Sequence, residues 1–195
     1  MPNYILIEGV DGSGKDTQGD RLAARLGALR VNEPDNSLPT GQLLRQMLKD
    51  GSYVEAHAAM FLADRMAMQA TRVKPHLAAG GDVVSVRSFV SSLVYQQENW
   101  PLDWLLSIHR HLPCKATHLI LLDIDPEIAL QRATRRPGHM EFYEKVDTQK
   151  RNRQRYLDLV PVLPEFLGGP QRVGVIDALG TPEEVEARIQ EWLGQ

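Results

Sequence analysis

Cysteine is almost absent from this chain, because Cys114 is the only one among 195 residues. A single cysteine excludes an intrachain disulfide framework, so we expect a reducing, cytoplasmic setting. Long apolar runs are also missing. No stretch is long enough to span a membrane, and the chain does not start with a basic segment followed by a signal-type apolar run. We therefore expect no membrane partner.

An excess of charge of one sign is missing as well. The 22 Lys and Arg residues and the 25 Asp and Glu residues leave a formal net charge of −3. This balance argues against general nucleic-acid affinity carried by bulk charge, although it leaves room for a local basic groove. The hydrophobic content of 43% is ordinary for a globular protein. The length predicts one α/β domain over residues 1–195.

A glycine-rich stretch at residues 9–15, GVDGSGK, is the most informative motif in the chain. The apolar run Tyr4–Ile7 precedes it, and apolar residues recur at helical spacing after Lys15. Strand, turn and helix in this order, with the spacing G-x-x-x-x-G-K, are typical of a phosphate-binding loop. Its backbone N–H groups and the positive end of the helix form an anion site, to which Lys15 adds a full charge. The alternative is a glycine-rich turn that caps an ordinary helix.

Five short runs predict strands that alternate with helices. The strands are expected at residues 4–7, 29–31, 82–86, 118–123 and 172–177. The helices are expected over 40–49, 54–77 with a bend near Pro75, 100–111 and 141–159, and after Lys15, Ser91, Pro126 and Thr181. In the helix over 40–49, the buried side is expected to carry Leu43, Leu44, Met47 and Leu48. The pattern predicts one doubly wound domain with a five-stranded parallel sheet and helices on both faces.

Three further residues could bound a ligand pocket. Arg87 follows the strand at 82–86, at the carboxyl edge where parallel sheets bind ligands, and its planar guanidinium suits a phosphate. Phe61 and Arg65 are four residues apart and share one helix face. Their spacing alone favours another interpretation, in which Phe61 joins the core and Arg65 is a solvated charge paired with Asp64.

A group of arginines ends the helix that begins at Pro126. Arg132, Arg135 and Arg136 come just before Pro137-Gly138. Basic residues ahead of a flexible break either form a lid that closes on phosphates or complement the dipole of the helix. The residues themselves leave both interpretations open.

Together these motifs resemble the thymidylate kinases, a family that transfers the γ-phosphate of ATP to deoxythymidine monophosphate (dTMP). The resemblance covers nearly the whole chain and rests on the order and spacing of its motifs. In chain order these are Glu8–Lys15 with Thr17-Gln18, Glu33-Pro34, Gly41, Leu44-Arg45, Phe61–Arg65, Arg87, Ser91–Gln96, Leu122-Asp123, Pro126–Leu130 and Val175–Ala178. It implies a three-layer P-loop kinase fold with a short arginine-rich lid over about residues 132–143.

On the acceptor side, the resemblance implies that Phe61 stacks on the base and that Arg65 reaches its exocyclic oxygen. This reverses the interpretation from spacing alone. Arg45 and Arg87 would hold the acceptor phosphate, and Tyr95 would lie against the deoxyribose. The other acceptor-side residues would be Asp11, Glu33, Pro34, Ser91, Ser92 and Gln96.

On the ATP side, the resemblance implies that Lys15, Mg²⁺ and the lid arginines Arg135 and Arg136 neutralise the transferring phosphate, with Arg87 from the acceptor side. Asp11 would lie near the sugar hydroxyl and the metal. ATP would contact Gly12, Ser13, Gly14, Lys15, Asp16, Thr17, Arg132, Asp177 and Ala178. Because the acceptor is already an anion, catalysis requires positioning and charge neutralisation rather than a strong base. The family also implies a homodimer, with the helix over 54–77 or the region over 100–111 as the interface.

Two departures from the family pattern lie near the expected metal. Asp16 replaces the Ser or Thr whose hydroxyl usually holds Mg²⁺, and Val86 replaces the acid expected before Arg87. We interpret them as linked, because a carboxylate is lost at the strand end and another is gained in the loop. Asp16 would then ligate Mg²⁺ directly or through water. The alternative is that Asp16 only caps the helix.

Two other departures concern the acceptor base. Asn32 replaces an arginine before Glu33, and Ser88 replaces an aromatic residue after Arg87. Phosphorylation of dTMP to dTDP is the first hypothesis, and a kinase for another or a modified deoxynucleoside monophosphate, such as a modified dUMP, is the second. A nucleotide-binding protein that has lost turnover is the third. A kinase acting on bases within DNA is the fourth, which the composition disfavours.

Overall fold

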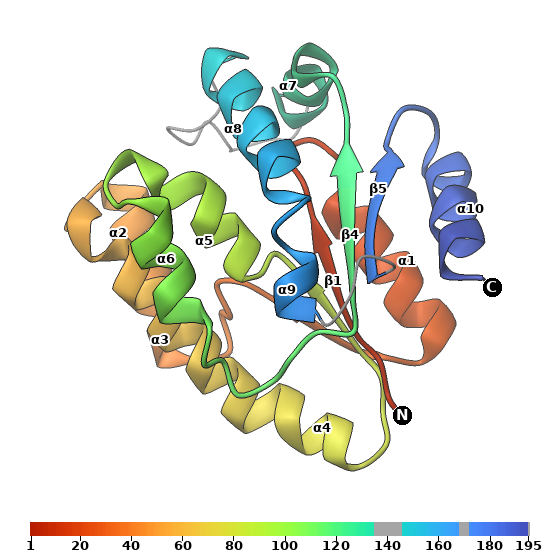
Figure 1. The fold of residues 1–195 in the computed structure, drawn as a ribbon, viewed down its shortest axis with the longest axis horizontal. Coiled ribbons are helices and arrows are strands. Elements are labelled where there is room, and N and C mark those ends of the chain that lie inside the picture. The colour runs from red at the N-terminus through yellow and green to blue at the C-terminus, as the bar shows by residue number, and fades with distance from the viewer. Residues whose placement is uncertain (135–145, 168–171, 195) are drawn as a thin grey trace.

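The computed structural model describes residues 1–134, 146–167 and 172–194, and Figure 1 shows its arrangement of strands and helices. One parallel sheet has the order β2-β3-β1-β4-β5, which confirms the predicted fold class. Its strands are β1 (Tyr4–Glu8), β2 (Leu29–Asn32), β3 (Val83–Val86), β4 (His118–Asp123) and β5 (Val173–Asp177).

Helices cover both faces of this sheet. In Figure 1, α1 and α10 lie behind the sheet, and α8 and α9 lie in front of it. The described α-helices are α1 (Lys15–Leu26), α2 (Pro39–Asp50), α3 (His57–Met68), α4 (Lys74–Ala78), α5 (Phe89–Tyr95), α6 (Leu102–His109), α7 (Pro126–Thr134), α8 (Val146–Leu159), α9 (Pro164–Leu167) and α10 (Pro182–Leu193). Short 3₁₀ turns occupy Val54–Ala56 and Gln96–Glu98.

The sheet order determines where a site can form. The central strands β1, β3 and β4 are almost wholly buried, as expected for parallel strands covered on both faces. After β1, the next two strands, β2 and β3, lie on one side of β1, and the last two, β4 and β5, lie on its other side. The direction in which strands are added therefore reverses beside β1. Ile7 is in register with Val86, so the loop after β1 and Arg87 after β3 emerge side by side. Ligands of such sheets bind at this reversal point, at the carboxyl ends of the strands.

Two details of the helices differ from the sequence prediction. Leu43 is 54% exposed, whereas Leu44 and Met47 are buried. Adjacent helical residues point about 100° apart, so Leu43 and Leu44 cannot both face the same neighbour. The long helix is interrupted by a π-helical segment at Gln69–Val73, just before Pro75 rather than at it. A proline has no N–H to continue the helical ladder, and the wider turn comes immediately before it.

The start of α5 also differs from the prediction. It begins at Phe89, two residues before the expected Ser91, because the Ser88 hydroxyl accepts a hydrogen bond from the Val90 N–H and caps the helix. The start of α10 after Thr181 is confirmed, and Thr181 caps the helix by forming a capping box with Glu184.

Most of the expected lid lies outside the described residues. Arg135 and Arg136, like the expected start of the helix at 141, lie outside the described residues. Residues 132–134 belong to the last turn of α7. Within the described ranges, no helix is both long enough and apolar enough to cross a membrane.

A buried histidine ends α6. His109 is 2% exposed, and its ring centroid lies 6.1 Å from that of Phe89. Burial lowers the pKa of His109, and the positive charge of Arg65 lowers it further. The ring is therefore neutral in the folded protein at pH values where an unfolded chain would protonate it.

We predict that His109 makes the folded protein less stable as the pH falls below about 6.5, the ordinary pKa of histidine. The unfolded state binds one proton that the folded state does not, so the free energy of unfolding decreases by about 1.4 kcal/mol per pH unit through this group. Urea unfolding at pH 7, 6 and 5 should show a shallower decrease for His109→Gln than for the wild type. His111→Gln, which changes an exposed histidine, is the control and should keep the wild-type slope. Equal slopes for His109→Gln and the wild type would contradict the assignment.

Candidate active site

The glycine-rich loop connects β1 to α1 and curls as its sequence predicts. Gly9, Gly12 and Gly14 all have positive φ angles, a region that costs residues with a side chain. At Gly12 a Cβ atom would lie 1.9 Å from the Ala129 carbonyl oxygen of α7. Glycine at position 12 is thus required for α7 to approach the loop.

A compact group of charges lies at the end of this loop. The buried Lys15 Nζ donates hydrogen bonds to the Val10 carbonyl oxygen at 3.2 Å and to Asp11 Oδ1 at 2.8 Å. Arg87 Nη2 donates to the same Asp11 oxygen, and its guanidinium lies 5.4 Å from the centre of the Tyr95 ring. Arg87 has a φ of 65°, a conformation uncommon outside glycine. Two cations from different elements therefore share one carboxylate.

The pKa values in this group reflect burial and charge together. Burial alone would raise the pKa of Asp11, but Arg87 and Lys15 outweigh it and hold that pKa well below its ordinary value. Burial lowers the pKa of Lys15, and Arg87 acts in the same direction, while Asp11 opposes both. Asp11 therefore remains a carboxylate and keeps the two cations close together.

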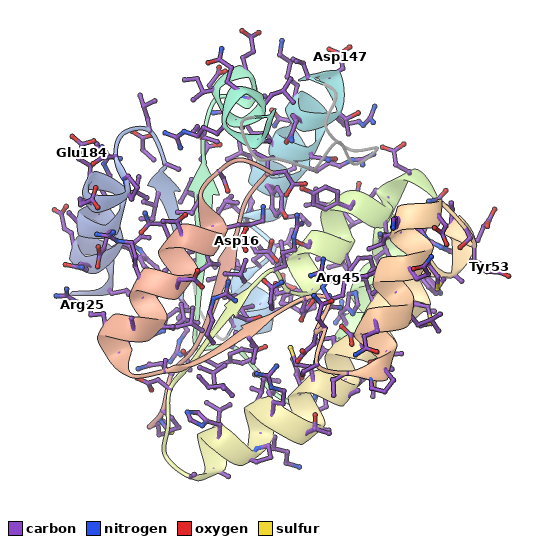
Figure 2. The ribbon with its side chains drawn as sticks, turned by 180° about the vertical axis from the view of Figure 1, so that it is seen from behind. Asp16, Arg25, Arg45, Tyr53, Asp147 and Glu184 are labelled. Carbon is purple, nitrogen blue, oxygen red and sulfur yellow. The ribbon has the colours of Figure 1, made fainter. Side chains whose placement is uncertain are left out.

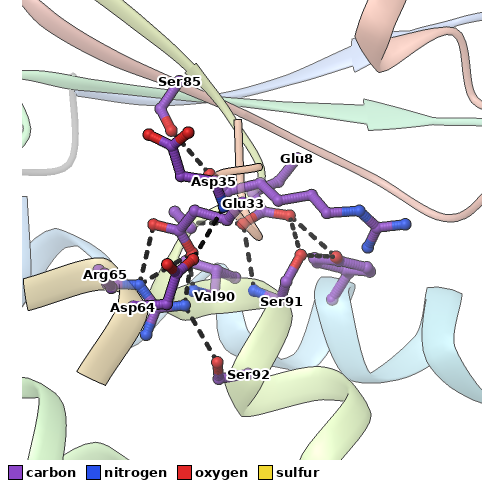
Figure 3. Close-up of polar contacts among 12 residues, drawn as sticks. Glu8, Glu33, Asp35, Asp64, Arg65, Ser85, Val90, Ser91 and Ser92 are labelled. Carbon is purple, nitrogen blue, oxygen red and sulfur yellow. Dashed lines mark hydrogen bonds and ion pairs between the residues drawn. The ribbon is translucent and has the colours of Figure 1, made fainter. Parts of the chain in front are cut away.

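A second ion pair, between Glu33 and Arg65, is deeply buried (Figure 3). Arg65 is 1% exposed, its Nε lies 3.0 and 2.9 Å from the two Glu33 oxygens, and its Nη2 lies 2.6 Å from one of them. Arg65 Nη2 also donates to Ser92 Oγ at 3.1 Å. Burial raises the pKa of Glu33 to about 7, although Arg65 acts in the opposite direction.

Spacing alone was misleading for Arg65. The side chain is neither solvated nor paired with Asp64, because Asp64 accepts hydrogen bonds from the Asp35 N–H at 2.9 Å and from Thr40 Oγ1 at 2.7 Å. Sequence neighbours on a helix point in different directions, so Asp64 and Arg65 serve different partners. Phe61, one turn earlier, is half-buried rather than part of the core.

One cavity of about 260 Å³ joins the loop to the segments around Glu33. Its walls come from the loop, the end of β2, α2, α3, Arg87 and α5. The predicted site residues that line it are Asp11, Gly12, Lys15, Asp16, Glu33, Pro34, Arg45, Phe61, Arg87, Ser91, Ser92, Tyr95 and Gln96. Arg65 lies outside this lining, behind Glu33 and Ser92.

Two polar groups of the cavity wall are notable because they have no hydrogen-bond partner within the described residues. One is the Arg45 Nε, although Arg45 Nη2 donates to the Pro34 carbonyl oxygen at 3.3 Å. The other is Asn32 Oδ1. Figure 2 shows Arg45 on α2 and Asp16 at the start of α1, on the two sides of this region. A ligand in the cavity could satisfy both groups.

The residues expected on the ATP side gather in two places. Gly14 caps α1, Ser13 is buried beside it, and Thr17 is half-buried one turn further on. Arg132 donates hydrogen bonds to the Ala178 and Gly180 carbonyl oxygens at 3.0 and 3.1 Å, so α7 reaches the turn after β5.

The turn after β5 is held by one hydrogen bond within itself and by another to the end of β4. The Asp177 carboxylate accepts a hydrogen bond from the Leu179 N–H at 2.9 Å, and the Ala178 N–H donates to the Asp123 carbonyl oxygen at 2.8 Å. Asp177 and Ala178 are not part of the cavity lining. Helix α7 contacts both the glycine-rich loop, at Gly12, and this turn, at Ala178. It therefore connects Asp177 and Ala178 to the loop.

The carboxylates of the cavity lining fit a Mg²⁺ ion that is held mainly by the phosphate oxygens of a ligand. Among the residues that the structure describes, no three His, Cys, Asp or Glu side chains gather closely enough to hold a metal by themselves. Mg²⁺ commonly uses one or two carboxylates together with phosphate oxygens and waters. Asp11 and Asp16 both line the cavity. The Asp16 side chain is 47% exposed and lies 3.7 Å from Arg30 Nη2.

Glu8 joins β1 to the segments packed beside the site, a role that the sequence did not predict. Its buried carboxylate accepts hydrogen bonds from Ser88 Oγ at 2.7 Å, from Ser91 Oγ at 2.8 Å and from Tyr156 Oη at 2.9 Å. Ser88, one of the departures from the family pattern, thus holds Glu8 and caps α5 rather than lining the cavity. An acid within an otherwise apolar buried strand was the available signal. Tyr156, far along the chain, gave none.

A second unassigned pair lies at the end of β4. Arg153 of α8 donates two hydrogen bonds to the Asp123 carboxylate, at 2.6 and 2.8 Å. Next to it on α8, Gln149 Nε2 lies 3.4 Å from the Asp11 carbonyl oxygen. The start of α8 therefore packs over the glycine-rich loop.

Comparison with known proteins gives one consistent family. The thymidylate kinase family model matches residues 7–189. A protein named probable thymidylate kinase from Methanosarcina acetivorans is 32% identical over 197 residues, covering 95% of this chain and 92% of the relative. Another of the same name, from Pyrococcus horikoshii, is 33% identical over 199 residues, covering 95% and 93%.

A solved structure supports the same assignment. The thymidylate kinase of Candida albicans superimposes with a TM-score of 0.82 at 25% identity, covering 99% of this chain and 91% of that one. This likeness confirms the P-loop kinase fold that the sequence predicted. With a family match over most of its length, a lysine-bearing phosphate loop and the matching order of strands, the chain belongs to the thymidylate kinase family and is a nucleoside monophosphate kinase.

Proposed function

We propose that this protein transfers the γ-phosphate of ATP to dTMP and releases dTDP and ADP. One observation carries the proposal. A single cavity is lined by three cations, Lys15, Arg45 and Arg87, and by the Phe61 ring. Such a cavity can hold a phosphate group and a base at the same time.

On the acceptor side, the proposal assigns the phosphate of dTMP to Arg45 and Arg87. The unpartnered Nε of Arg45 supports this role, since a buried guanidinium nitrogen requires an acceptor. Phe61 would stack on the base and Tyr95 would lie against the deoxyribose. Ser91, Ser92 and Gln96 would complete the base pocket, together with Glu33 and Pro34.

Arg65 keeps its proposed contact with the exocyclic oxygen of the base. Because its guanidinium is held by Glu33 and Ser92 behind the cavity wall, this contact requires the side chain to shift when the nucleotide binds. The bond to Ser92 is the weaker of the two and would break first, since the other is a charge-assisted bidentate contact.

Transfer joins an oxygen of the acceptor phosphate to the γ-phosphorus and breaks the bond to the oxygen that bridges the β- and γ-phosphates. Lys15 and Arg87 stabilise the charge on the transferring group, and Asp11 holds these two cations in position. We propose that Arg135 and Arg136 add charge from the lid. Arg132, Asp177 and Ala178 would lie on the adenine side, and Gly12, Ser13, Gly14 and Thr17 around the phosphates.

Mg²⁺, when bound with ATP, neutralises charge on the β- and γ-phosphate oxygens. Asp16 is the proposed ligand, directly or through water, and Asp11 is a second carboxylate in the same cavity lining. Arg30 balances the charge of Asp16 from the side of β2. We further propose a homodimer, as the family resemblance implies.

A different or modified pyrimidine is the second candidate acceptor. The specific observation in its favour is Asn32, which lines the cavity and whose buried Oδ1 has no hydrogen-bond partner among the described residues, so that it could accept a hydrogen bond from the base. The Candida albicans relative is described as having broad substrate specificity. The test of the proposal therefore compares several acceptors.

We predict that ADP release with ATP and Mg²⁺ is fastest with dTMP, at least about tenfold faster than with dCMP, dAMP or dGMP, which corresponds to roughly 1.4 kcal/mol. A coupled assay of ADP measures the rate. Lys15→Ala should reduce kcat by about 10²–10³-fold, since it removes one of the charges on the transferring phosphate. Faster turnover with another acceptor would favour the second candidate. An unchanged rate in Lys15→Ala would contradict the proposed role of the loop.

We predict that Asp16→Ala abolishes Mg²⁺-dependent turnover and that Asp16→Ser only weakens it, because a hydroxyl can still meet the ion. Asp20→Ala is the matched control. Asp20 lies one turn further on α1 and is also paired with Arg30, at 3.0 Å, but it does not line the cavity. The measurement is kcat and the Mg²⁺ concentration for half-maximal activity. If Asp16→Ala behaves like Asp20→Ala, then Asp16 serves the helix and Arg30 rather than the metal.

A further inference from the structure

A second cavity, of about 310 Å³, adjoins the Glu33–Arg65 pair. Its walls come from β1, α3 and α5, from the end of α6 and the residues that follow it up to Ala116, and from α9. Glu33 is the one residue that lines both cavities, and neither the glycine-rich loop nor Arg45 reaches the second one. The two cavities are therefore separate, and the Glu33–Arg65 pair stands at the wall between them.

Two side chains in the lining of this cavity, Arg65 and His109, carry buried polar atoms that have no partner among the residues that the structure describes. Arg65 uses Nε and Nη2 for Glu33 and Ser92, which leaves Nη1 without an acceptor (Figure 3). Neither ring nitrogen of His109 has a hydrogen-bond partner, and both side chains are almost fully buried. Leaving buried donors unpaired costs free energy, so this region favours a molecule that brings an acceptor.

The apolar part of the wall is aromatic. The ring centroids of Phe89 and Phe166 lie 5.5 Å apart with an angle of 34° between their planes, and His109 lies 6.1 Å from Phe89. The Arg110 guanidinium lies 6.0 Å from the centre of the Phe166 ring. A planar ring could pack against these side chains in the offset or edge-to-face arrangements that aromatic groups prefer.

Charge at the cavity favours a single negative charge on that molecule. Glu33 and Arg65 balance each other in their ion pair. The other charged residues of the described lining are two exposed cations, Arg110 and Lys115, and one acid, Glu165. The described walls thus keep one positive charge in excess.

We propose that this cavity binds a small aromatic monocarboxylate. The carboxylate accepts hydrogen bonds from Arg65 Nη1 and from an N–H of His109. The ring packs against Phe89 and Phe166, and Arg110 covers the entrance. The ligand fits this cavity because its acid satisfies the buried donors while its ring replaces water at an apolar wall.

Benzoate is the probe that tests this proposal, with benzyl alcohol as its uncharged counterpart. The protein carries ¹⁵N-labelled histidine, and the His109 ring signals are followed by NMR during titration. We expect a saturable shift with a Kd of about 1 mM, which is typical of a ligand of this size. Benzyl alcohol should bind at least about tenfold more weakly, a difference of roughly 1.4 kcal/mol. No saturable shift with benzoate would overturn the proposal, as would equal affinity for the two probes.

Two variants and one competitor locate the binding. Arg110→Gln removes an exposed rim charge and should weaken benzoate several-fold, whereas Arg25→Gln, at an exposed arginine on α1, should leave the Kd unchanged. Cys114→Leu fills part of the cavity and should abolish the shift. Because dTMP would draw Arg65 towards the base in the proposed function, saturating dTMP should weaken benzoate several-fold but should leave the shift in place, through His109 and the aromatic wall. A shift that dTMP removes, or that survives in both Arg110→Gln and Cys114→Leu, would overturn the proposal. No ATP is used, so the outcome is independent of the proposed transfer reaction.

Discussion

The proposed acceptor side of this protein depends on the buried ion pair between Glu33 and Arg65. Glu33 follows β2 and Arg65 lies on α3, so the pair fixes the distance between the sheet edge and that helix. Removing one partner of such a pair leaves an uncompensated buried charge, at a cost of about 3–5 kcal/mol. Phe61 stands one turn before Arg65, so the same contact sets where the ring meets the cavity. Glu33 also lies between the cavity beside the glycine-rich loop and the second cavity beside α9.

A second constraint comes from the order of the strands. Because β1 and β3 are neighbours in register, the loop after β1 and Arg87 after β3 meet at one point. Lys15 and Arg87 would repel each other there, and the carboxylate of Asp11 holds both. An incoming phosphate finds two cations already positioned, which is the condition for fast phosphoryl transfer. Glu8, at the end of β1, supports this arrangement because it accepts hydrogen bonds from Ser91 of α5 and Tyr156 of α8 and so links the three elements.

The sequence was most informative where chemistry is local. The glycine-rich loop, the apolar run of β4 and the cap of α10 at Thr181 all have signals within a few residues, and each is confirmed. The carboxyl-edge position of Arg87 followed from the strand pattern. Pairing over long distances was not predictable. Tyr156 and Glu8 are 148 positions apart, and nothing near Arg65 indicated that its partner is Glu33 rather than Asp64. Tertiary packing makes these choices, and the family resemblance supplied only the proposed roles of the site residues.

The measurement that most directly tests the nucleotide cavity is a crystal structure of the protein with dTMP bound. The phosphate should lie within hydrogen-bonding distance of Arg45 and Arg87, and the base should lie against Phe61. Arg65 should have moved towards the base while still contacting Glu33. A dTMP molecule bound elsewhere, with Arg45 and Phe61 uncontacted, would contradict the assignment of this cavity as the acceptor site.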